Sequence, residues 1–367
     1  MAGIPRLCVT NRIQAPATIL SASSAATGSP VSRLKDQLRS KTWRSKLGYN
    51  PHALLSDQLP FLDAGVARLA QLTPGNFATP ALYAAHVTTQ MNAVAVTNTY
   101  LCSYDAGTSK FTIARATGAG TFGLPFATGA TTRSTHPDLG FASTDLTGAT
   151  TYTAGSVSFK SREFITADFG SALTVLAGIV VNHNLGTSGT ITQMGHTVDT
   201  AAGWAAPDVS DVLAGDASIR IAFRASASKQ FWRLLINDCG NSLGYSEVGI
   251  WFAGPYTQPT VSYAIGFTKA WEELSDVTVA ISGAHFQDEK ARRPTWGLQW
   301  SEVGEADRAA LAAAFALVPK GRCFFFSFDA ATPTDTEYVV LAEGVSERLT
   351  SGLYFDVPVP ALAGALG

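Results

Sequence analysis

The chain has 367 residues, of which 46% are hydrophobic and only 15% are charged, with a formal net charge of −2. This length predicts two or three domains with sizeable cores. The balanced charge, without a basic block, argues against a nucleic-acid binder. No apolar stretch is long enough to span a membrane, and the opening MAGIPRLCVTNRI lacks the apolar segment of a secretory signal.

Residues that bind metals or form disulfides are sparse. The four cysteines, Cys8, Cys102, Cys239 and Cys323, are far apart and form no CxxC motif, so we expect free, mostly buried thiols. The histidines show neither HxH nor HExxH spacing, which argues against zinc. No GxGxxG or GxxxxGK[ST] motif indicates phosphate or nucleotide binding.

The segment Leu7–Arg44 begins with a short predicted strand and continues through Ser/Ala/Gly loops to Trp43. A helix is predicted further on, because Thr79 is a favourable N-cap and Pro80 would occupy the first helical position. Apolar residues then recur at helical spacing as far as Met91.

A β-hairpin follows this helix, with strands Val94–Tyr104 and Lys110–Arg115 on either side of a tight turn. Thr121–Phe126 is a third predicted strand. We expect helix and hairpin to form one compact unit, because each has an apolar face to cover. The residues predicted to be buried together are Leu82, Val94, Val96, Phe111 and Ile113.

The stretch Phe164–Leu185, FITADFGSALTVLAGIVVNHNL, predicts two strands. Glu163–Phe169 ends at a Gly-Ser break, and Leu173–Val181 is a nearly continuous apolar run of the kind found in strands buried on both faces. The polar residues Asn182, His183 and Asn184 end that run. They are expected to bond backbone groups at the strand end, which is a structural role.

Further strands are predicted across the rest of the chain, with a boundary at Pro255 and Pro259. Beyond this boundary Gly304–Leu317 predicts an Ala/Leu-rich helix, and CFFFSF at Cys323–Phe328 predicts an aromatic strand. The predicted strands are Thr190–His196, Ile219–Ala225, Phe231–Ile236, Gly244–Phe252, Ser275–Gly283, Pro294–Trp300, Glu337–Leu341 and Leu353–Pro358.

Three groups of motifs carry a resemblance. Phe164–Leu185 and FWRLLINDCGNSLGYSEVGIWFAG at 231–254 resemble the galactose-binding-like (discoidin-type) β-sandwich in the version found in tailed-bacteriophage tail proteins. The order LTPGN…YDAGTSKFTI…TFGLPFATG resembles a small α+β module of phage and prophage structural proteins. RPTWGLQWSEVGEADRAAL…CFFFSFDA resembles the C-terminal domain of phage tail-tip and baseplate proteins.

The resemblance implies a mainly β fold with α+β parts. Residues 1–50 and 157–258 would form the galactose-binding-like β-sandwich, split by an inserted α+β module at 51–156. Residues 259–367 would form a C-terminal α+β tail-assembly domain. No cofactor is predicted. The alternative that the resemblance leaves open is one structural calcium ion near Asp36 and Glu247.

Catalysis is not expected. His183 and Asp168 suggest a His-Asp pair, but no GxSxG nucleophile elbow accompanies them. Carbohydrate binding is the serious alternative, because discoidin-type domains bind sugars through loop aromatics. The candidate glycan contacts are Trp43, Trp204, Tyr245 and Tyr256.

We therefore expect a non-enzymatic structural protein of the bacteriophage virion, made in the host cytoplasm and placed in the distal tail, tail tip or baseplate. Its partners would be copies of itself in a ring, other tail proteins and, as an alternative, a host-surface glycan. The runner-up functions are a carbohydrate-binding adhesin and an accessory domain of a glycan-degrading enzyme. The apolar C-terminal segment VPVPALAGALG, 357–367, is expected to dock on another subunit or on another tail protein.

Overall fold

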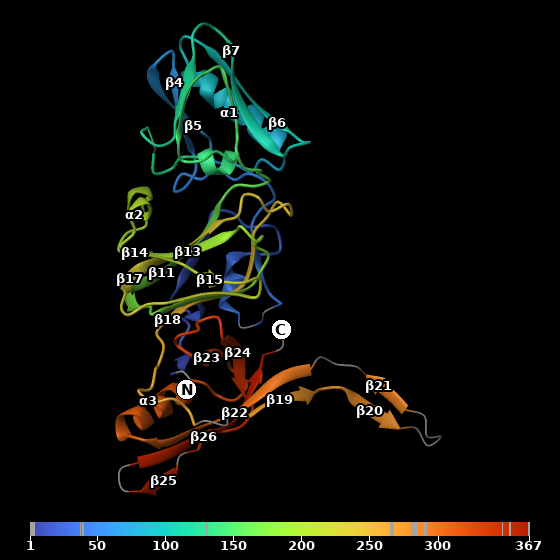
Figure 1. Ribbon diagram of the computed structural model, residues 1–367, viewed down its shortest axis with the longest axis vertical. Helices are drawn as coiled ribbons and strands as arrows, with labels where there is room; N and C mark the ends of the chain where they lie inside the picture. The colour runs from blue at the N-terminus through green and yellow to red at the C-terminus, as the bar shows by residue number, and fades with distance from the viewer. Residues whose placement is uncertain are drawn as a thin grey trace.

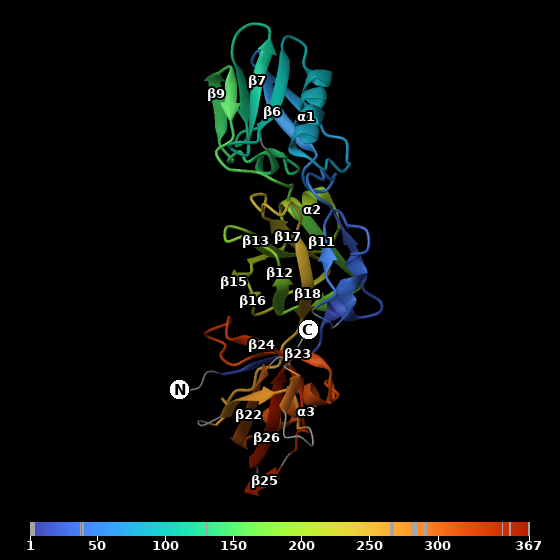
Figure 2. The same ribbon diagram turned by 90° about the vertical axis from the view of Figure 1, so that its right-hand side faces the viewer.

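The protein is mainly β, with several antiparallel sheets and few helices, as the sequence predicted. The computed structural model describes residues 4–36, 38, 40–129, 131–264, 268–279, 285–288, 292–346, 348–351 and 354–365. Three modules follow one another along the long axis in Figure 1: an insertion module at one end, a sandwich in the middle and a C-terminal module at the other end. Figure 2 shows the same stacking from the side.

Two five-stranded antiparallel sheets form the sandwich. The strands of the first sheet are, in spatial order, β14 (Val209–Val212), β13 (Thr190–His196), β17 (Ser228–Asn237), β11 (Glu163–Thr174) and β2 (Ile19–Ala22). Those of the second are β15 (Ala214–Gly215), β16 (Ile219–Phe223), β12 (Ala177–His183), β18 (Glu247–Gly254) and β3 (Trp43–Arg44). Short helices η1 (Arg12–Gln14), η2 (Val31–Lys35) and α2 (Ala201–Ala205) lie in the connections.

Strand β12 is buried on both faces, as its apolar run predicted. Val180 belongs to the core between the two sheets, whereas Ile179 and Val181 face the other way. That outer face packs against Phe325 and Tyr338 of the C-terminal module. The continuous apolar pattern therefore results from a contact between modules, which removes the outer face of the sheet from water.

The boundaries around this strand differ from the prediction. Leu173 still belongs to β11, and the chain then crosses from the first sheet to the second before β12 begins at Ala177. Gly170, with φ of 73°, lies in an irregularity of β11 rather than at its end. The apolar pattern of the sequence does not reveal where the chain crosses between sheets, because residues before and after the crossover are buried.

The insertion module has two sheets, a helix α1 (Pro80–Val94) and a short helix η3 (His136–Leu139). The four-stranded sheet has the order β5 (Val66–Gln71), β4 (Gln58–Asp63), β8 (Phe122–Pro125) and β9 (Asp145–Ala149). The three-stranded sheet has the order β10 (Thr151–Thr153), β7 (Lys110–Thr117) and β6 (Thr99–Asp105). The core of the insertion module is rich in aromatic residues, and the rings of Tyr49 and Tyr83 stack with their centroids 4.5 Å apart.

The predicted N-cap of α1 is present, because the Thr79 hydroxyl accepts a hydrogen bond from the Leu82 backbone N–H at 3.3 Å. The set of helix and hairpin residues predicted to be buried together is partly wrong, because two of its five members are exposed. Leu82 is 57% exposed and Val96 is 74% exposed, whereas Tyr83, Ala84, Val87 and Met91 face the core. Small alanines occur on both sides of this helix, so its sequence does not single out one face.

A seven-stranded antiparallel sheet forms the C-terminal module, and helix α3 (Glu305–Ala316) packs on it. The strand order is β1 (Arg6–Cys8), β23 (Cys323–Ser327), β24 (Thr336–Leu341), β26 (Tyr354–Gly364), β22 (Arg292–Val303) and β19 (Thr268–Glu273), with β25 (Arg348–Ser351) beside β26. Strand β1 thus pairs with a strand from the far end of the chain, so the prediction that all of residues 1–50 belong to the sandwich is wrong.

The prediction for the C-terminal segment is also wrong. Its residues up to Gly364 lie in β26, which pairs with β22, β24 and β25 of the same chain. Val357, Val359 and Leu362 are at most 1% exposed. The segment is apolar because it is an internal strand, so it presents no apolar strip for another subunit.

A two-stranded ribbon projects from this module. Strand β19 pairs with the N-terminal half of β22, and β20 (Asp276–Val279) pairs with β21 (His285–Asp288) farther out. In Figure 1 strands β20 and β21 lie away from all three modules, and we call the described residues 268–279, 285–288 and 292–294 the arm. Part of the predicted strand Ser275–Gly283 lies outside the described residues; the described part is β20.

Replacing Gln193 with methionine is expected to raise the free energy of unfolding by about 1–2 kcal/mol. Gln193 is fully buried, its side chain packs over Gly178 of the opposite sheet, and neither amide atom has a hydrogen-bond partner. Methionine keeps the shape and removes the unsatisfied dipole. Denaturant unfolding measures the change. Gln230→Met is the control, because Gln230 bonds Asp168 and should gain nothing; a destabilised Gln193→Met variant would contradict the expectation.

Candidate functional site

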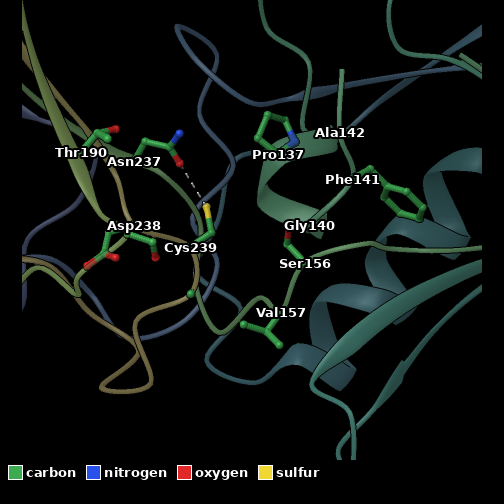
Figure 3. A pocket seen from close by; sticks show the side chains of 12 residues that line it. Pro137, Gly140, Phe141, Ala142, Ser156, Val157, Thr190, Asn237, Asp238 and Cys239 are labelled. Atoms are coloured by element: carbon green, nitrogen blue, oxygen red, sulfur yellow. Dashed lines mark hydrogen bonds between the residues drawn. The ribbon is translucent and has the colours of Figure 1, made fainter. Parts of the chain in front are cut away.

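A cleft of about 530 Å³ lies where the insertion module meets the sandwich. Figure 3 shows side chains from both modules around it. Its lining is Pro137, Gly140, Phe141, Ala142, Ser156 and Val157 from the insertion module and its exit, and Ser188, Thr190, Asn237, Asp238, Cys239 and Gly240 from the sandwich. The sandwich contributes most of the polar groups and the insertion module most of the apolar ones.

Asp238 is the best-fixed polar group of the cleft. It is 4% exposed, and its Oδ2 accepts hydrogen bonds from the Gly186 backbone N–H at 3.0 Å and from Asn241 Nδ2 at 2.9 Å. Gly189 packs so closely that a Cβ there would lie 2.7 Å from Asp238. The carboxylate is therefore held rigidly, beside the exposed side chain of Asn237.

Cys239 is not suited to act as a nucleophile. Burial, and then the nearby Asp138 carboxylate, raise the pKa of its thiol to about 12, so the thiol stays protonated at neutral pH. Its Sγ lies 3.8 Å from Asp138 Oδ1 and 3.9 Å from Asn237 Oδ1, the latter drawn as a dashed line in Figure 3. Within the described ranges, no group of three or more His, Cys, Asp or Glu side chains is placed to hold a metal ion.

A buried ion pair ties the two modules together behind this cleft. Asp138 is fully buried, and its Oδ1 accepts hydrogen bonds from Arg162 Nε at 2.7 Å and from the Arg162 backbone N–H at 3.1 Å. Arg162 also donates to the Ser134 carbonyl at 2.7 Å. The segment that leaves the insertion module is thus fixed to η3 at the point where the sandwich resumes.

Two of the aromatic residues predicted to contact glycans are buried. Trp43 is 0% exposed and donates its indole N–H to the Ser24 carbonyl at 3.1 Å. Trp204 is 6% exposed, and the Arg233 guanidinium lies 4.1 Å from the centre of its ring. Neither ring offers an open face to a sugar, so the prediction is wrong for both residues.

The other two candidates are half-buried and lie apart from each other. Tyr245 precedes β18 and its ring is covered by the Arg44 guanidinium at 4.5 Å. Tyr256 follows β18 and packs edge-on against Phe223. Because a whole strand separates them, they do not form one binding platform.

The residues at the end of β12 contact backbone groups. Asn182 has φ of 55°, and His183 Nδ1 accepts a hydrogen bond from the Leu185 N–H at 3.3 Å. Asn184 donates to the Tyr245 carbonyl at 3.0 Å and accepts from the Glu247 N–H at 2.7 Å. These bonds join the end of β12 to the loop that leads into β18.

Asn184→Ala is expected to lower the free energy of unfolding by about 1–3 kcal/mol, because the two backbone groups would lose their partner. Thermal and denaturant unfolding measure this loss. Asn237→Ala is the matched control, since Asn237 is exposed and should change stability little. A variant at position 184 as stable as the parent chain would show that water replaces the asparagine without cost.

The two acids that the resemblance suggested for calcium are paired with basic residues. Asp36 forms a 2.7 Å ion pair with Lys41, and Glu247 forms a 3.0 Å ion pair with Arg44. Each carboxylate is already neutralised within the chain. Neither pair provides the set of free oxygen ligands that calcium requires.

The arm was not recognised from the sequence as a functional element. Trp271 on β19 is 64% exposed, which makes it an unusually open large apolar side chain. Lys269 Nζ lies 5.9 Å from its ring centre, and Glu272 pairs with Arg293 at 2.6 Å. Among the residues that the structure describes, no helix has the length and apolar character needed to cross a membrane.

Comparisons with known proteins include solved structures that are similar to about a quarter of the chain. No protein-family model matches it, and no curated protein matches it. Among solved structures, chitosan-binding module 1 of a chitosanase/glucanase from Paenibacillus sp. IK-5 is 17% identical, with 26% of this chain and 70% of the module covered at a TM-score of 0.20. Module 2 of the same enzyme, in complex with chitotriose, is 14% identical, with 26% and 78% covered at a TM-score of 0.20.

Proposed function

We propose that this protein is a structural subunit that acts by protein–protein assembly, in the distal tail of a bacteriophage virion. In this proposal the sandwich is galactose-binding-like, the insertion module extends the subunit at one end and the C-terminal module makes the assembly contacts. The observation that carries the assembly role is the arm. The placement in a phage tail rests on the motif resemblances described above.

The arm favours assembly because a two-stranded ribbon is only marginally stable in water by itself. Of its described side chains, Thr268, Lys269, Ala270, Trp271 and Glu273 are exposed. A ribbon that buries so little against its own chain gains stability when a partner covers it. Strand β19 is also a sheet edge, with backbone groups open to pairing.

The composition of the arm supports the same role. Tryptophan is enriched among the residues that contribute most of the binding energy at protein interfaces. An exposed tryptophan lowers the solubility of a monomer, so its presence on the surface favours a binding role. Trp271 is flanked along the strand by Lys269 and Glu273, which would supply a polar rim around an apolar anchor.

Immunogold electron microscopy of virions that carry this chain tests the proposal. An antibody raised against the purified protein is expected to label the distal end of the tail. Label confined to the head, or absent from particles that contain the chain by mass spectrometry, would refute the tail placement.

Carbohydrate binding in the cleft is the second candidate function. A volume of about 530 Å³ lies within the usual range of ligand sites, and the fixed Asp238 carboxylate with Asn237 and Thr190 would accept and donate hydrogen bonds to sugar hydroxyls. Calorimetric titration with a panel of neutral and amino oligosaccharides tests it. Binding that weakens in the Asn237→Ala variant would support this function. Absence of a heat of binding with every sugar in the panel would exclude it.

A further inference from the structure

A second pocket, with an apolar floor, lies on the C-terminal module, away from the arm. It has a volume of about 280 Å³ and lies between the end of α3 and the loop after β24. Its lining consists of Ala312, Phe315, Ala316, Val318, Lys320, Leu341, Glu343, Gly344 and Val345. Figure 1 shows α3 and strands β20 and β21 at opposite ends of this module. We call this hollow the α3 pocket.

The α3 pocket has an apolar floor and a charged rim. Phe315, Val318 and Leu341 are buried in its floor, whereas Lys320 and Glu343 are exposed at its edge. In Figure 1 the arm leaves the module at the end opposite to α3. The pocket therefore offers apolar contact area to an outside group.

Trp271 lies on the same face of the ribbon as the buried Trp296, but beyond the edge of the core. Strand alternation places Lys269, Trp271 and Glu273 on one face of β19, and the register sets Lys269 opposite Trp296. Trp296 is 3% exposed and belongs to the core that α3 covers. Two residue pairs farther along the ribbon, Trp271 lies opposite Pro294, past the edge of that core, and is 64% exposed.

We propose that Trp271 of one copy binds in the α3 pocket of a second copy of this chain. A buried tryptophan contributes about 150–250 Å² of contact, and the apolar pocket floor supplies the surface for it. This inference rests on the proposed assembly function and names its partner and its contact. Because the arm and the pocket are different surfaces, the contact is heterologous and each copy retains one free arm or pocket for the next.

The charges around the two surfaces are complementary. Beside Trp271 the arm carries Glu273 and Arg292, which pair with each other at an exposed site. The pocket rim carries Lys320 and Glu343. An exposed ion pair contributes little, so Glu273 can turn to Lys320 and Arg292 to Glu343 at small cost. The pocket of a second copy would therefore cover Trp271 and pair with the charged side chains beside it.

Two variants each disrupt one of the two surfaces of this contact. Trp271→Ala removes the anchor but keeps the pocket. Ala316→Phe fills the pocket but keeps the arm; Ala316 is exposed at the end of α3, so the larger ring need not enter the core. Val212→Ala, which shortens a 62% exposed side chain on the sandwich, is the control. Thermal unfolding of each purified variant verifies that the fold is intact.

Sedimentation velocity of the full chain over a range of concentrations is the test. The parent chain and the control are expected to form species larger than a dimer, and each variant alone to associate about thirtyfold more weakly or worse. An equimolar mixture of the two variants is expected to stop at a heterodimer, because only one arm and one pocket remain usable.

Other outcomes overturn the inference. If Ala316→Phe assembles as the parent does, the arm binds elsewhere; if the mixture stays monomeric, the two surfaces do not meet. A parent chain that is monomeric at every concentration would also overturn the contact between copies. Immunogold labelling of the distal tail would still stand in that case, so failure of this contact and failure of the proposed function are distinguishable.

Discussion

Asp63→Ala is expected to lower the free energy of unfolding by about 3–5 kcal/mol. Asp63 is fully buried at the end of β4 and accepts hydrogen bonds from the backbone N–H groups of Val96, Thr97 and Asn98 at 2.8, 2.9 and 3.2 Å. It also accepts from Asn98 Nδ2 and from the Tyr100 hydroxyl, each at 2.9 Å. One carboxylate thereby fixes the whole turn between α1 and β6, and alanine would leave these donors without partners.

Denaturant unfolding followed by tyrosine and far-UV signals measures this loss. Asp105→Ala is the matched control in the same module, because Asp105 caps an exposed hairpin turn through Gly107 and Thr108. The control is expected to lose far less, because the Asp105 carboxylate is exposed. Equal losses for the two variants would show that the buried network contributes no more than an ordinary turn.

The same carboxylate predicts a pH dependence. Burial by itself would raise the pKa of Asp63, but the hydrogen bonds from Thr97, Val96, Tyr100 and Asn98 outweigh burial and lower it from 3.8 to about 2. A lowered folded-state pKa gives stability that is present above pH 4 and is lost as the pH falls toward 2. The contribution is roughly 2 kcal/mol, and Asp63→Ala is expected to lack this part of the acid-induced loss.

Asp138→Ala is the second large expected effect, again about 3–5 kcal/mol. The substitution would leave the Arg162 guanidinium, whose side chain is only 13% exposed, without its counter-ion at the junction of two modules. Burial alone would lower the pKa of Arg162, but the charge and hydrogen bond of Asp138, together with Cys239 and Tyr83, outweigh burial and raise the pKa. Arg162 therefore remains charged, and its desolvation is compensated only while Asp138 is present.

Thermal unfolding and limited proteolysis near residues 156–162 measure the effect. The double variant Asp138→Leu with Arg162→Met is expected to recover most of the lost stability, because it removes both charges. Asp36→Ala, which breaks the exposed pair with Lys41, is expected to cost less than about 1 kcal/mol. If the double variant is as unstable as the single one, the lost packing rather than the unpaired charge is responsible.

Local features of the fold were predictable where one residue or one pattern determines them. Thr79 and Pro80 predicted the start of α1, and the apolar run Leu173–Val181 predicted a strand buried on both faces, which begins at Ala177. Features that depend on distant partners were not predictable. Strand β1 pairs with β23 across almost the whole chain, and β26 is apolar because it is internal to a sheet.

The candidate sites were harder to predict than the fold. The cleft combines residues near 140, 156, 188 and 238, so no sequence spacing marks it. Trp43 and Trp204 looked like loop aromatics, but whether a tryptophan faces solvent depends on neighbours such as Arg233 that the sequence does not locate. The exposure of Trp271 follows from the extent of the core beneath the ribbon, which only the packed structure defines.

Cryo-electron microscopy of the tail tip of virions that carry this chain would show directly whether its copies assemble through the arm. We expect several copies around the tail axis, with the arm of each copy in contact with the C-terminal module of its neighbour. A single copy whose arm touches no other chain, or a ring whose contacts leave Trp271 in solvent, would contradict it.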